Sequence, residues 1–451
     1  MKADGITFLF TLLIITQTIS YAHAHNLYVM RWHETYGGNW PDIAHSAQQT
    51  NDNGYIIAGQ TSSFGAGGID FYLVKTDSNG NMQWNKTYGG TDQDEAFAVR
   101  QTSDGGYVIA GTTNSFGARF SDFWVVKTDS NGNTQWNKTY GGLRIDVAYS
   151  IQQTIDGGYM VAGTTNSFGS GSNDFWLIKT DPNGGMQWNK AYGGLYEDVA
   201  NSVQQTSDGG YIVCGYTSSF GKGLEDFWLV KTDSNGNMQW NKTYGGKDRD
   251  YAHSVQQTTD NGYIIAGSTF SLGAGLEAWL VKTDSSGSMQ WNKNYGGSLD
   301  DEAYEAQQTS DGGYIIAGFT DSFANNRDIW LIKTDSSGNV EWNRTYGGNE
   351  KDEACVVQQT SDGGYMIAGT TYSFGASWDP DFWLIKLIER GLPADVNGDG
   401  TVNRLDADAV AKSFGSRSGD ISWNLDADID GNGIINILDV TLVAKSFGKS
   451  V

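Results

Sequence analysis

One sequence unit recurs seven times along this chain of 451 residues. Its clearest copy, residues 104–142, reads D-G-G-Y-V-I-A-G-T-T, then S-D-F-W-V-V-K-T-D-S-N-G-N, then T-Q-W-N-K-T-Y-G-G. A repeat of this length marks a supersecondary unit that must stack on its neighbours to bury its apolar faces. The first tyrosine of the unit recurs every 51 or 52 residues, at Tyr55, Tyr107, Tyr159, Tyr211, Tyr263, Tyr314 and Tyr365.

Each unit contains four short apolar segments separated by Gly, Asn and Asp, which is typical of a four-stranded blade. In the third unit these segments are residues 148–154, 159–165, 174–180 and 186–192. The second and third segments are almost continuously apolar, as in strands that are covered on both faces. The fourth segment alternates, as in a half-exposed outer strand. We therefore predict a mainly β fold, a seven-bladed β-propeller.

The seventh unit lacks its fourth segment, because the repeat ends with D-F-W-L-I-K at residues 381–386. The missing segment is found at the other end of the chain. Residues 29–38, V-M-R-W-H-E-T-Y-G-G, match the pattern M-Q-W-N-K-T-Y-G-G of the other units. We predict that this N-terminal strand completes the last blade and removes the open edges of the ring.

The N-terminus carries an apolar stretch of ten residues, 6–15, preceded by Lys2 and followed by Ala22-His23-Ala24. This pattern resembles a secretory signal peptide of residues 1–24 with an A-x-A cleavage site. The alternative is an N-terminal anchor, but a bilayer span needs about 20 apolar residues. We expect a secreted, extracellular or cell-surface protein with no membrane insertion of the mature chain.

The composition restricts the partners and the redox chemistry of the chain. A formal net charge of −23 argues against binding to nucleic acid or to anionic membranes. Cys214 and Cys355 belong to blades that lie far apart around the ring, so we expect no disulfide between them. Both are predicted to be small buried hydrophobic residues.

The composition changes after residue 390. Residues 395–406 place oxygen-bearing side chains at positions 1, 3, 5, 9 and 12 with Gly at position 6, and residues 428–439 repeat the pattern 33 positions later. This is the calcium loop of an EF-hand with Asp at position 12, and position 7 supplies a backbone carbonyl. Two ordinary polar turns are the alternative. Helices are expected over 407–414 and 440–447. The predicted ligands of two Ca²⁺ ions are Asp395, Asn397, Asp399, Thr401, Asp406, Asp428, Asp430, Asn432, Ile434 and Asp439.

The duplicated loop and helix resemble a type I dockerin, which gives a domain at residues 391–451. The resemblance implies calcium-dependent binding to a cohesin module on another protein. Loop positions 10 and 11, often Ser-Thr in that family, are here Arg404-Leu405 and Ile437-Leu438, which puts cellulosome-type partners in doubt. Residues 25–390 resemble the secreted prokaryotic β-propeller repeat proteins, whose units also carry W…Y-G-G. That resemblance specifies the fold and says little of function.

The connections between the second and third segments, and between one unit and the next, vary in sequence, whereas the other connections hardly change. Because both variable connections emerge on one face of a blade, we expect all the differences between units to lie on that face. It is a candidate surface for a glycan or a surface protein, although solvent-facing loops that simply drift would look the same. The residues predicted to bind the ligand are Trp40, Phe120, Arg144, Tyr196, Arg249 and Trp378.

An aspartate also lies two residues before the alanine of the first segment in every unit, for example Asp146 and Asp198. These seven side chains either cap the N–H groups of their own loops or together hold a cation, and capping is favoured. No nucleophile or pair of catalytic carboxylates is recognisable. The favoured function is a non-catalytic binding or scaffold protein. The alternatives are a polysaccharide hydrolase or lyase of a dockerin-linked assembly and a purely structural envelope component.

Overall fold

The computed structural model describes residues 27–273, 275–375, 378–390, 396, 402–415, 427 and 435–447. Residues 28–389 form one compact unit, and the described C-terminal residues belong to a second unit. Within these ranges, no helix has the length and apolar character needed to cross a bilayer.

The first unit consists of 28 strands in seven separate sheets of four. Six sheets are each built from four consecutive strands. The first three are β2 (Asp42–Gln49), β3 (Tyr55–Thr61), β4 (Asp70–Thr76) and β5 (Met82–Tyr88); β6 (Asp94–Gln101), β7 (Tyr107–Thr113), β8 (Asp122–Thr128) and β9 (Thr134–Tyr140); and β10 (Asp146–Gln153), β11 (Tyr159–Thr165), β12 (Asp174–Thr180) and β13 (Met186–Tyr192). The next three are β14 (Asp198–Gln205), β15 (Tyr211–Thr217), β16 (Asp226–Thr232) and β17 (Met238–Tyr244); β18 (Asp250–Gln257), β19 (Tyr263–Thr269), β20 (Glu277–Thr283) and β21 (Met289–Tyr295); and β22 (Asp301–Gln308), β23 (Tyr314–Thr320), β24 (Asp328–Thr334) and β25 (Val340–Tyr346).

The seventh sheet joins the two ends of the propeller sequence. Its order is β1-β28-β27-β26, in which β1 (Leu27–Tyr36) lies beside β28 (Asp381–Arg390), followed by β27 (Tyr365–Thr371) and β26 (Asp352–Gln359). The indole Nε1–H of Trp383 on β28 donates to His33 Nδ1 on β1 at 3.1 Å. The predicted closure of the last blade by the N-terminal strand is confirmed.

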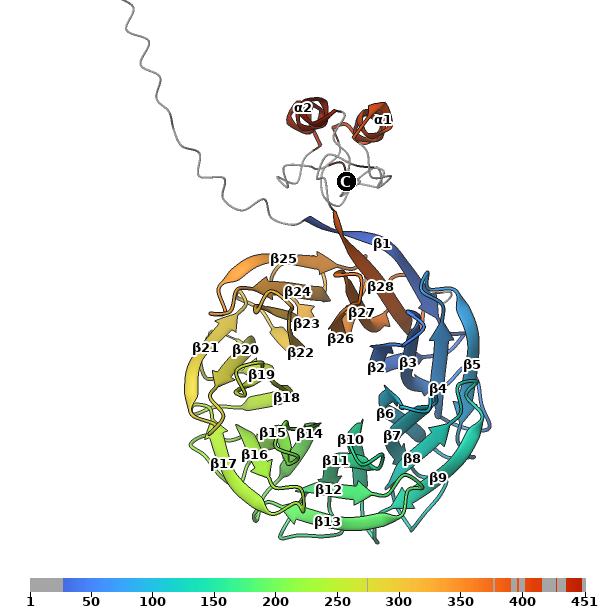
Figure 1. Ribbon diagram of the computed structural model, residues 1–451, viewed down its shortest axis with the longest axis vertical. Helices are drawn as coiled ribbons and strands as arrows, with labels where there is room; N and C mark the ends of the chain where they lie inside the picture. Colours follow the sequence, from blue (N-terminus) through green and yellow to red (C-terminus); the bar gives the residue numbers. More distant parts are fainter. Residues whose placement is uncertain are drawn as a thin grey trace, which may run out of the picture. The chain divides into compact units, whose positions relative to one another are not determined.

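The seven sheets are arranged as the blades of a propeller around a central axis, with the first strand of each blade innermost and the fourth outermost (Figure 1). The seven-bladed fold is therefore confirmed. Burial follows the prediction from the sequence: every residue of β11 and β12 is buried, whereas every residue of β13 is exposed or half-buried. The apolar cores lie between adjacent blades, because each core cluster contains residues of two neighbouring sheets.

Adjacent blades are also joined at the outer edge. The hydroxyl of Tyr140, at the end of β9, donates to the carbonyl of Gly184 in the next blade at 2.6 Å. Gly184 has a φ of +77°, a left-handed conformation that glycine adopts without strain. The equivalent bond recurs at five other blade junctions: Tyr36 to Gly80, Tyr88 to Gly132, Tyr192 to Gly236, Tyr244 to Gly287 and Tyr295 to Gly338.

The second unit contains two short helices, α1 (Arg404–Lys412) and α2 (Ile437–Ser446). Both begin three residues before the predicted segments 407–414 and 440–447. They begin early because the last residue of each predicted calcium loop, Asp406 or Asp439, already lies in the first helical turn.

Candidate functional site

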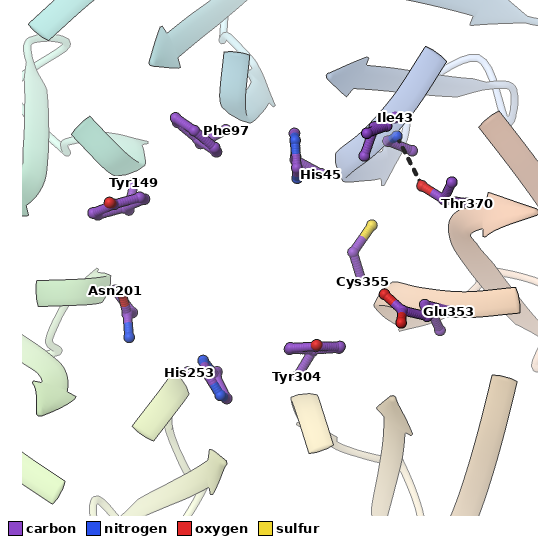
Figure 2. Close-up of a pocket in the computed structure, with 12 residues that line it drawn as sticks. Ile43, His45, Phe97, Tyr149, Asn201, His253, Tyr304, Glu353, Cys355 and Thr370 are labelled. Atoms are coloured by element: carbon purple, nitrogen blue, oxygen red, sulfur yellow. Dashed lines mark hydrogen bonds between the residues drawn. The ribbon is translucent and has the colours of Figure 1, made fainter. Parts of the chain in front are cut away.

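The innermost strand of each blade places its fourth residue at the centre of the ring. These side chains line a cavity of 340 Å³ and point towards its centre (Figure 2). The size lies within the usual range of small-molecule pockets, about 300–1,000 Å³. We call this cavity the funnel, and its seven ring residues are His45, Phe97, Tyr149, Asn201, His253, Tyr304 and Cys355.

Aromatic contacts between neighbouring blades form part of the funnel wall. The ring of Phe97 lies 5.0 Å from that of His45 and 5.2 Å from that of Tyr149, measured between centroids. On the opposite side, the rings of His253 and Tyr304 are 5.2 Å apart. Burial lowers the pKa of His45 to about 4, so this imidazole is neutral at physiological pH. The wall therefore offers aromatic rings, polar groups and the carboxylate of Glu353, which pairs with Arg327 at 3.0 Å.

The carboxylate of Glu302, which is 13% exposed, contacts two of the ring residues, His253 and Tyr304. Glu302 Oε1 lies 2.7 Å from His253 Nε2 and accepts a hydrogen bond from the Ser268 hydroxyl at 2.9 Å. Burial alone would raise the pKa of Glu302, but the hydrogen bond and charge of His253 lower it. Burial, and then the charge of Glu302, raise the pKa of Tyr304. Tyr304 thus remains a neutral phenol that can donate a hydrogen bond.

The expectation that all the differences between units lie on the face of the variable connections is wrong, because strand positions that line the central channel also vary. The ring position holds five residue types, although its neighbour in the chain is alanine in every unit, as at Ala148 and Ala252. The sequence carried this signal, since Cys355 stands where other units have Tyr149 or Asn201. Cys355 is also half-buried in the funnel wall rather than buried as predicted, whereas Cys214 is buried; both thiols are free, as expected.

The six residues that were predicted to bind the ligand lie in the variable connections. Trp378 is 92% exposed, Tyr196 65%, Trp40 63% and Phe120 50%. Arg144 donates to Asn166 at 3.2 Å, and Arg249 pairs with Glu225 at 3.1 Å. In the part of the chain that the structure describes, no hydrogen bond, ion pair or ring contact joins any two of the six.

The loops of Trp40 and Trp378 are nevertheless neighbours. The N–H of Asp42, two residues after Trp40, donates to the carbonyl of Pro380, two residues after Trp378, at 2.7 Å. A proline follows each tryptophan within two positions and restricts the loop backbone. The closure of the ring therefore brings two exposed tryptophans, far apart in sequence, to adjacent loops.

The aspartates that begin the inner strands cap their own loops, as favoured from the sequence. Asp146 Oδ2 accepts the N–H of Gly142 at 2.9 Å and the hydroxyl of Ser167 at 2.7 Å, and Oδ1 accepts the hydroxyl of Thr165. The corresponding bonds recur in the other blades, for example at Asp198 and Asp301. Since these donors already occupy the carboxylate oxygens, a shared cation has little support.

A second acidic residue, which the sequence did not reveal, lies beside each capping aspartate. An added Cβ on Gly193 would lie 1.8 Å from Asp174 Oδ1 and 2.7 Å from Asp198 Oδ2, so two carboxyl groups of adjacent blades converge there. Asp174 Oδ1 is buried and has no hydrogen-bond partner among the described residues. Burial, and then the charge of Asp198, raise the pKa of Asp174 to about 6. The same convergence recurs at Asp70 with Asp94 and at Asp122 with Asp146.

These acid pairs predict that the propeller is less stable at about pH 8 than at about pH 5. The pKa of Asp174 in the folded state lies above its ordinary value of about 3.9. Its contribution to the free energy of unfolding is therefore complete below about pH 4 and is lost as the pH rises through about 6. Thermal unfolding at the two pH values measures the difference. Asp174→Asn should reduce it, whereas a change at the exposed Asp248 should not; equal pH dependence of the two variants would contradict the prediction.

In the second unit, the last acidic residue of each predicted calcium loop is fully buried. Asp406 Oδ2 accepts the N–H of Asn403 at 2.7 Å, and Asp439 Oδ2 accepts the N–H of Asn436 at 2.8 Å. Two matching buried carboxylates are consistent with the oxygen donors that Ca²⁺ prefers. The other predicted ligands lie outside the described residues: Asp395, Asn397, Asp399, Thr401, Asp428, Asp430, Asn432 and Ile434.

The comparison with protein families decides the nature of this unit. Residues 393–448 match the family described as Dockerin type I domain. The C-terminal unit is a type I dockerin. Type I dockerins bind calcium, and dockerin domains bind cohesin modules.

The other comparisons match longer stretches of the chain. A stretch of 150 residues is 29% identical to the regulatory protein FlaEY of Caulobacter vibrioides, and it spans 30% of this chain but only 14% of that protein. The WD40 domain of Neurospora crassa Pan2 is 10% identical, with a TM-score of 0.50 over 80% of this chain and 96% of that domain. A fungal alcohol oxidase in complex with copper is 13% identical, with a TM-score of 0.50 over 83% of this chain and 79% of that chain. The two structures support the fold alone.

Proposed function

We propose that the protein is a secreted, non-catalytic binding component, which the dockerin attaches to a cohesin module on another protein and whose propeller binds a glycan. Residues 1–24 act as the secretion signal, residues 25–390 form the propeller and residues 391–451 form the dockerin with two Ca²⁺ ions. The exposed side chains of Arg404, Leu405 and Ile437 at the starts of the dockerin helices are available to the cohesin partner.

The observation that carries the binding role is the variation of the funnel ring on an otherwise repeated scaffold. Strand positions that only support the fold are nearly identical in all units, as at Ala148, Ala200 and Ala252. The ring residues differ, although a structural role would be met equally well by one residue type in every blade. Aromatic rings with hydrogen-bonding neighbours suit a sugar, which presents an apolar face and a rim of hydroxyl groups.

The face that surrounds the funnel extends this surface. The exposed Trp40 and Trp378 lie in adjacent loops on the side where the inner strands begin, which is also the side of the funnel. We propose that a longer glycan stacks on the two tryptophans while one of its sugars occupies the funnel. The exposed residues Tyr196 and Arg144 are further contacts on the same face.

The Trp40→Ala, Trp378→Ala double variant tests this surface. A glycan array with the intact protein first identifies a ligand, and calorimetry then gives its affinity. We expect the double variant to bind at least about 30-fold more weakly, because an interface aromatic of the hot-spot class contributes about 2 kcal/mol or more. The melting temperature should not change, since both side chains are exposed.

Ile155→Ala provides the matched control, because Ile155 is an equally exposed apolar residue (87%) in a connection of the opposite face. Normal glycan binding by the double variant would refute the proposed surface. Turnover of a polysaccharide that is lost on replacement of Glu197 or Asp379 would instead establish the hydrolase or lyase alternative.

A further inference from the structure

The half of the central channel beyond the funnel contains a second set of cavities. Two cavities of 160 Å³ each are lined by the later residues of the inner strands. Both are lined by Arg100 from β6 and Glu305 from β22. These two charged side chains stand at positions where other units carry neutral polar or small apolar residues.

In every other blade, a glutamine occupies the position of Arg100, and this glutamine has a structural role. The side-chain oxygen of Gln152, for example, accepts the backbone N–H of Gln205 in the next blade at 2.6 Å. Six such bonds join adjacent blades around the channel. In each bond the backbone N–H of the first glutamine donates to the side-chain oxygen of the second: Gln101 to Gln48, Gln205 to Gln152, Gln257 to Gln204, Gln308 to Gln256, Gln359 to Gln307 and Gln49 to Gln358.

Arg100 interrupts this circle of hydrogen bonds. A guanidinium group has no acceptor atom, so it cannot accept the N–H of Gln153 in the next blade. Its Nη1 donates instead to the carbonyl of Val99 at 2.8 Å and to Ser46 Oγ at 3.3 Å, both on its own side of the channel. Blade β6–β9 thus lacks one bond between blades and in exchange presents a cation to the cavities.

Glu305 is a second departure from the repeat. Four other blades have serine at this position, and Ser254 Oγ, for example, accepts the backbone N–H of Ala306 in the next blade at 3.2 Å. The Glu305 carboxylate takes over the equivalent bond, from the N–H of Val357. A longer, ionisable side chain is not needed for that bond. Burial raises the pKa of Glu305 to about 7, and the charge of Arg100 opposes this rise.

The two groups do not neutralise each other by direct contact. Among the ion pairs of the described residues there is none between Arg100 and Glu305, although both line the same two cavities. Since no ion pair joins them, each group remains able to pair with a charged group of a ligand in the cavities that both residues line. Where a repeated scaffold breaks its own pattern at the expense of a structural hydrogen bond, a functional site is the expected reason.

We propose that Arg100 and Glu305 form a second binding site, distinct from the funnel, for a small zwitterion of the α-amino acid class. The guanidinium receives the carboxylate of the ligand, and Glu305 receives its ammonium group. Ser202, Ser254 and the surrounding glutamine amides supply neutral hydrogen bonds. A ligand with only one charge would meet one of the two protein groups with the same sign, so both charges are required.

Calorimetry of the intact protein with glycine, alanine and serine at about pH 8 tests the site, with acetate and methylamine as singly charged controls. The decisive variants are Arg100→Gln and Glu305→Ser, since each restores the residue that the other blades use. We expect each variant to bind the amino acid at least tenfold more weakly. We expect Arg100→Gln to melt no lower than the wild type, because glutamine can accept the N–H of Gln153.

The alternatives give different results. If the charged pair only supports the channel through ordered water, no amino acid will bind and Arg100→Gln will lower the melting temperature; either result overturns the proposal. If acetate binds as tightly as glycine, the zwitterion class is wrong. The Trp40→Ala, Trp378→Ala variant should bind the amino acid normally, which separates this site from the glycan surface.

Discussion

Deletion of residues 26–36 should abolish the stability of the whole propeller, not only that of its last blade. Strand β1 supplies three buried side chains, Tyr28, Val29 and Tyr36, at the junction where the ring closes. Loss of one buried aromatic side chain typically costs about 3–5 kcal/mol, and the deletion removes two of them as well as a full strand pairing. The free energy of unfolding of an ordinary domain is about 5–15 kcal/mol. The loss caused by the deletion is comparable to most of this value.

The contacts of β1 explain why the effect spreads beyond one sheet. Tyr28 packs against Tyr365 at 4.6 Å and against Trp342 at 5.6 Å between ring centroids, which links the last two blades. At its other end, Tyr36 donates to the carbonyl of Gly80 in the first blade at 2.6 Å. Removal of the strand therefore separates the first blade from the last and exposes an unpaired edge on β28.

Thermal unfolding by calorimetry measures the result, and a chain that lacks only residues 1–24 is the control. The deletion variant should show either no cooperative transition or a melting temperature lower by about 10 °C or more, as expected from a loss of several kcal/mol in a domain of this size. A variant that places residues 26–38 after β28, through an Asp-Ser-Asn-Gly turn, should recover the transition. Melting of the deletion variant at the temperature of the control would refute the closure.

Removal of calcium should unfold the dockerin while the propeller remains folded. Among the described residues, the core of the C-terminal unit contains six buried hydrophobic residues, and its two helices have nine and ten residues. Helices this short are marginal without tertiary support. The acidic side chains of the two loops would also repel each other without a cation, so the binding energy of the metal is folding energy.

Hydrogen exchange of the full chain, resolved by peptide, is the suitable measurement. With a chelator, protection should be lost over residues 404–412 and 437–446 and retained in the strands of the propeller. Asp406→Asn should weaken calcium binding by at least about 100-fold, because even groups that only support a metal ligand contribute 10- to 100-fold. Asp408→Asn is the matched control, since Asp408 lies on the same helix with a side chain that is 54% exposed. Unchanged protection in the chelator, or equal effects of the two variants, would contradict the calcium role.

The repeat in the sequence was sufficient to predict the number of blades, the order of burial of their strands and the strand that closes the ring. Each of these follows from local patterns. The fully buried β11 and β12 are continuously apolar, β13 alternates, and residues 29–38 match the segment that the last unit lacks. The dockerin loops were equally visible, because the spacing of oxygen-bearing residues around a metal is set within twelve consecutive positions.

The tertiary structure determined which side chains meet around the central axis and which meet between blades. Lys127 illustrates this within one blade: it ends an apolar strand, and the fold buries its ammonium group against Asp104 at 2.8 Å, 23 positions away. Asp174 and Asp198 converge only because adjacent blades stack. His45 and His253, or Arg100 and Glu305, share a cavity only because seven strands stand at equal height around one axis. Side-chain alternation along a strand determines on which face of the sheet a residue lies. Which residues of distant blades lie near that residue is determined only by the curvature of the ring.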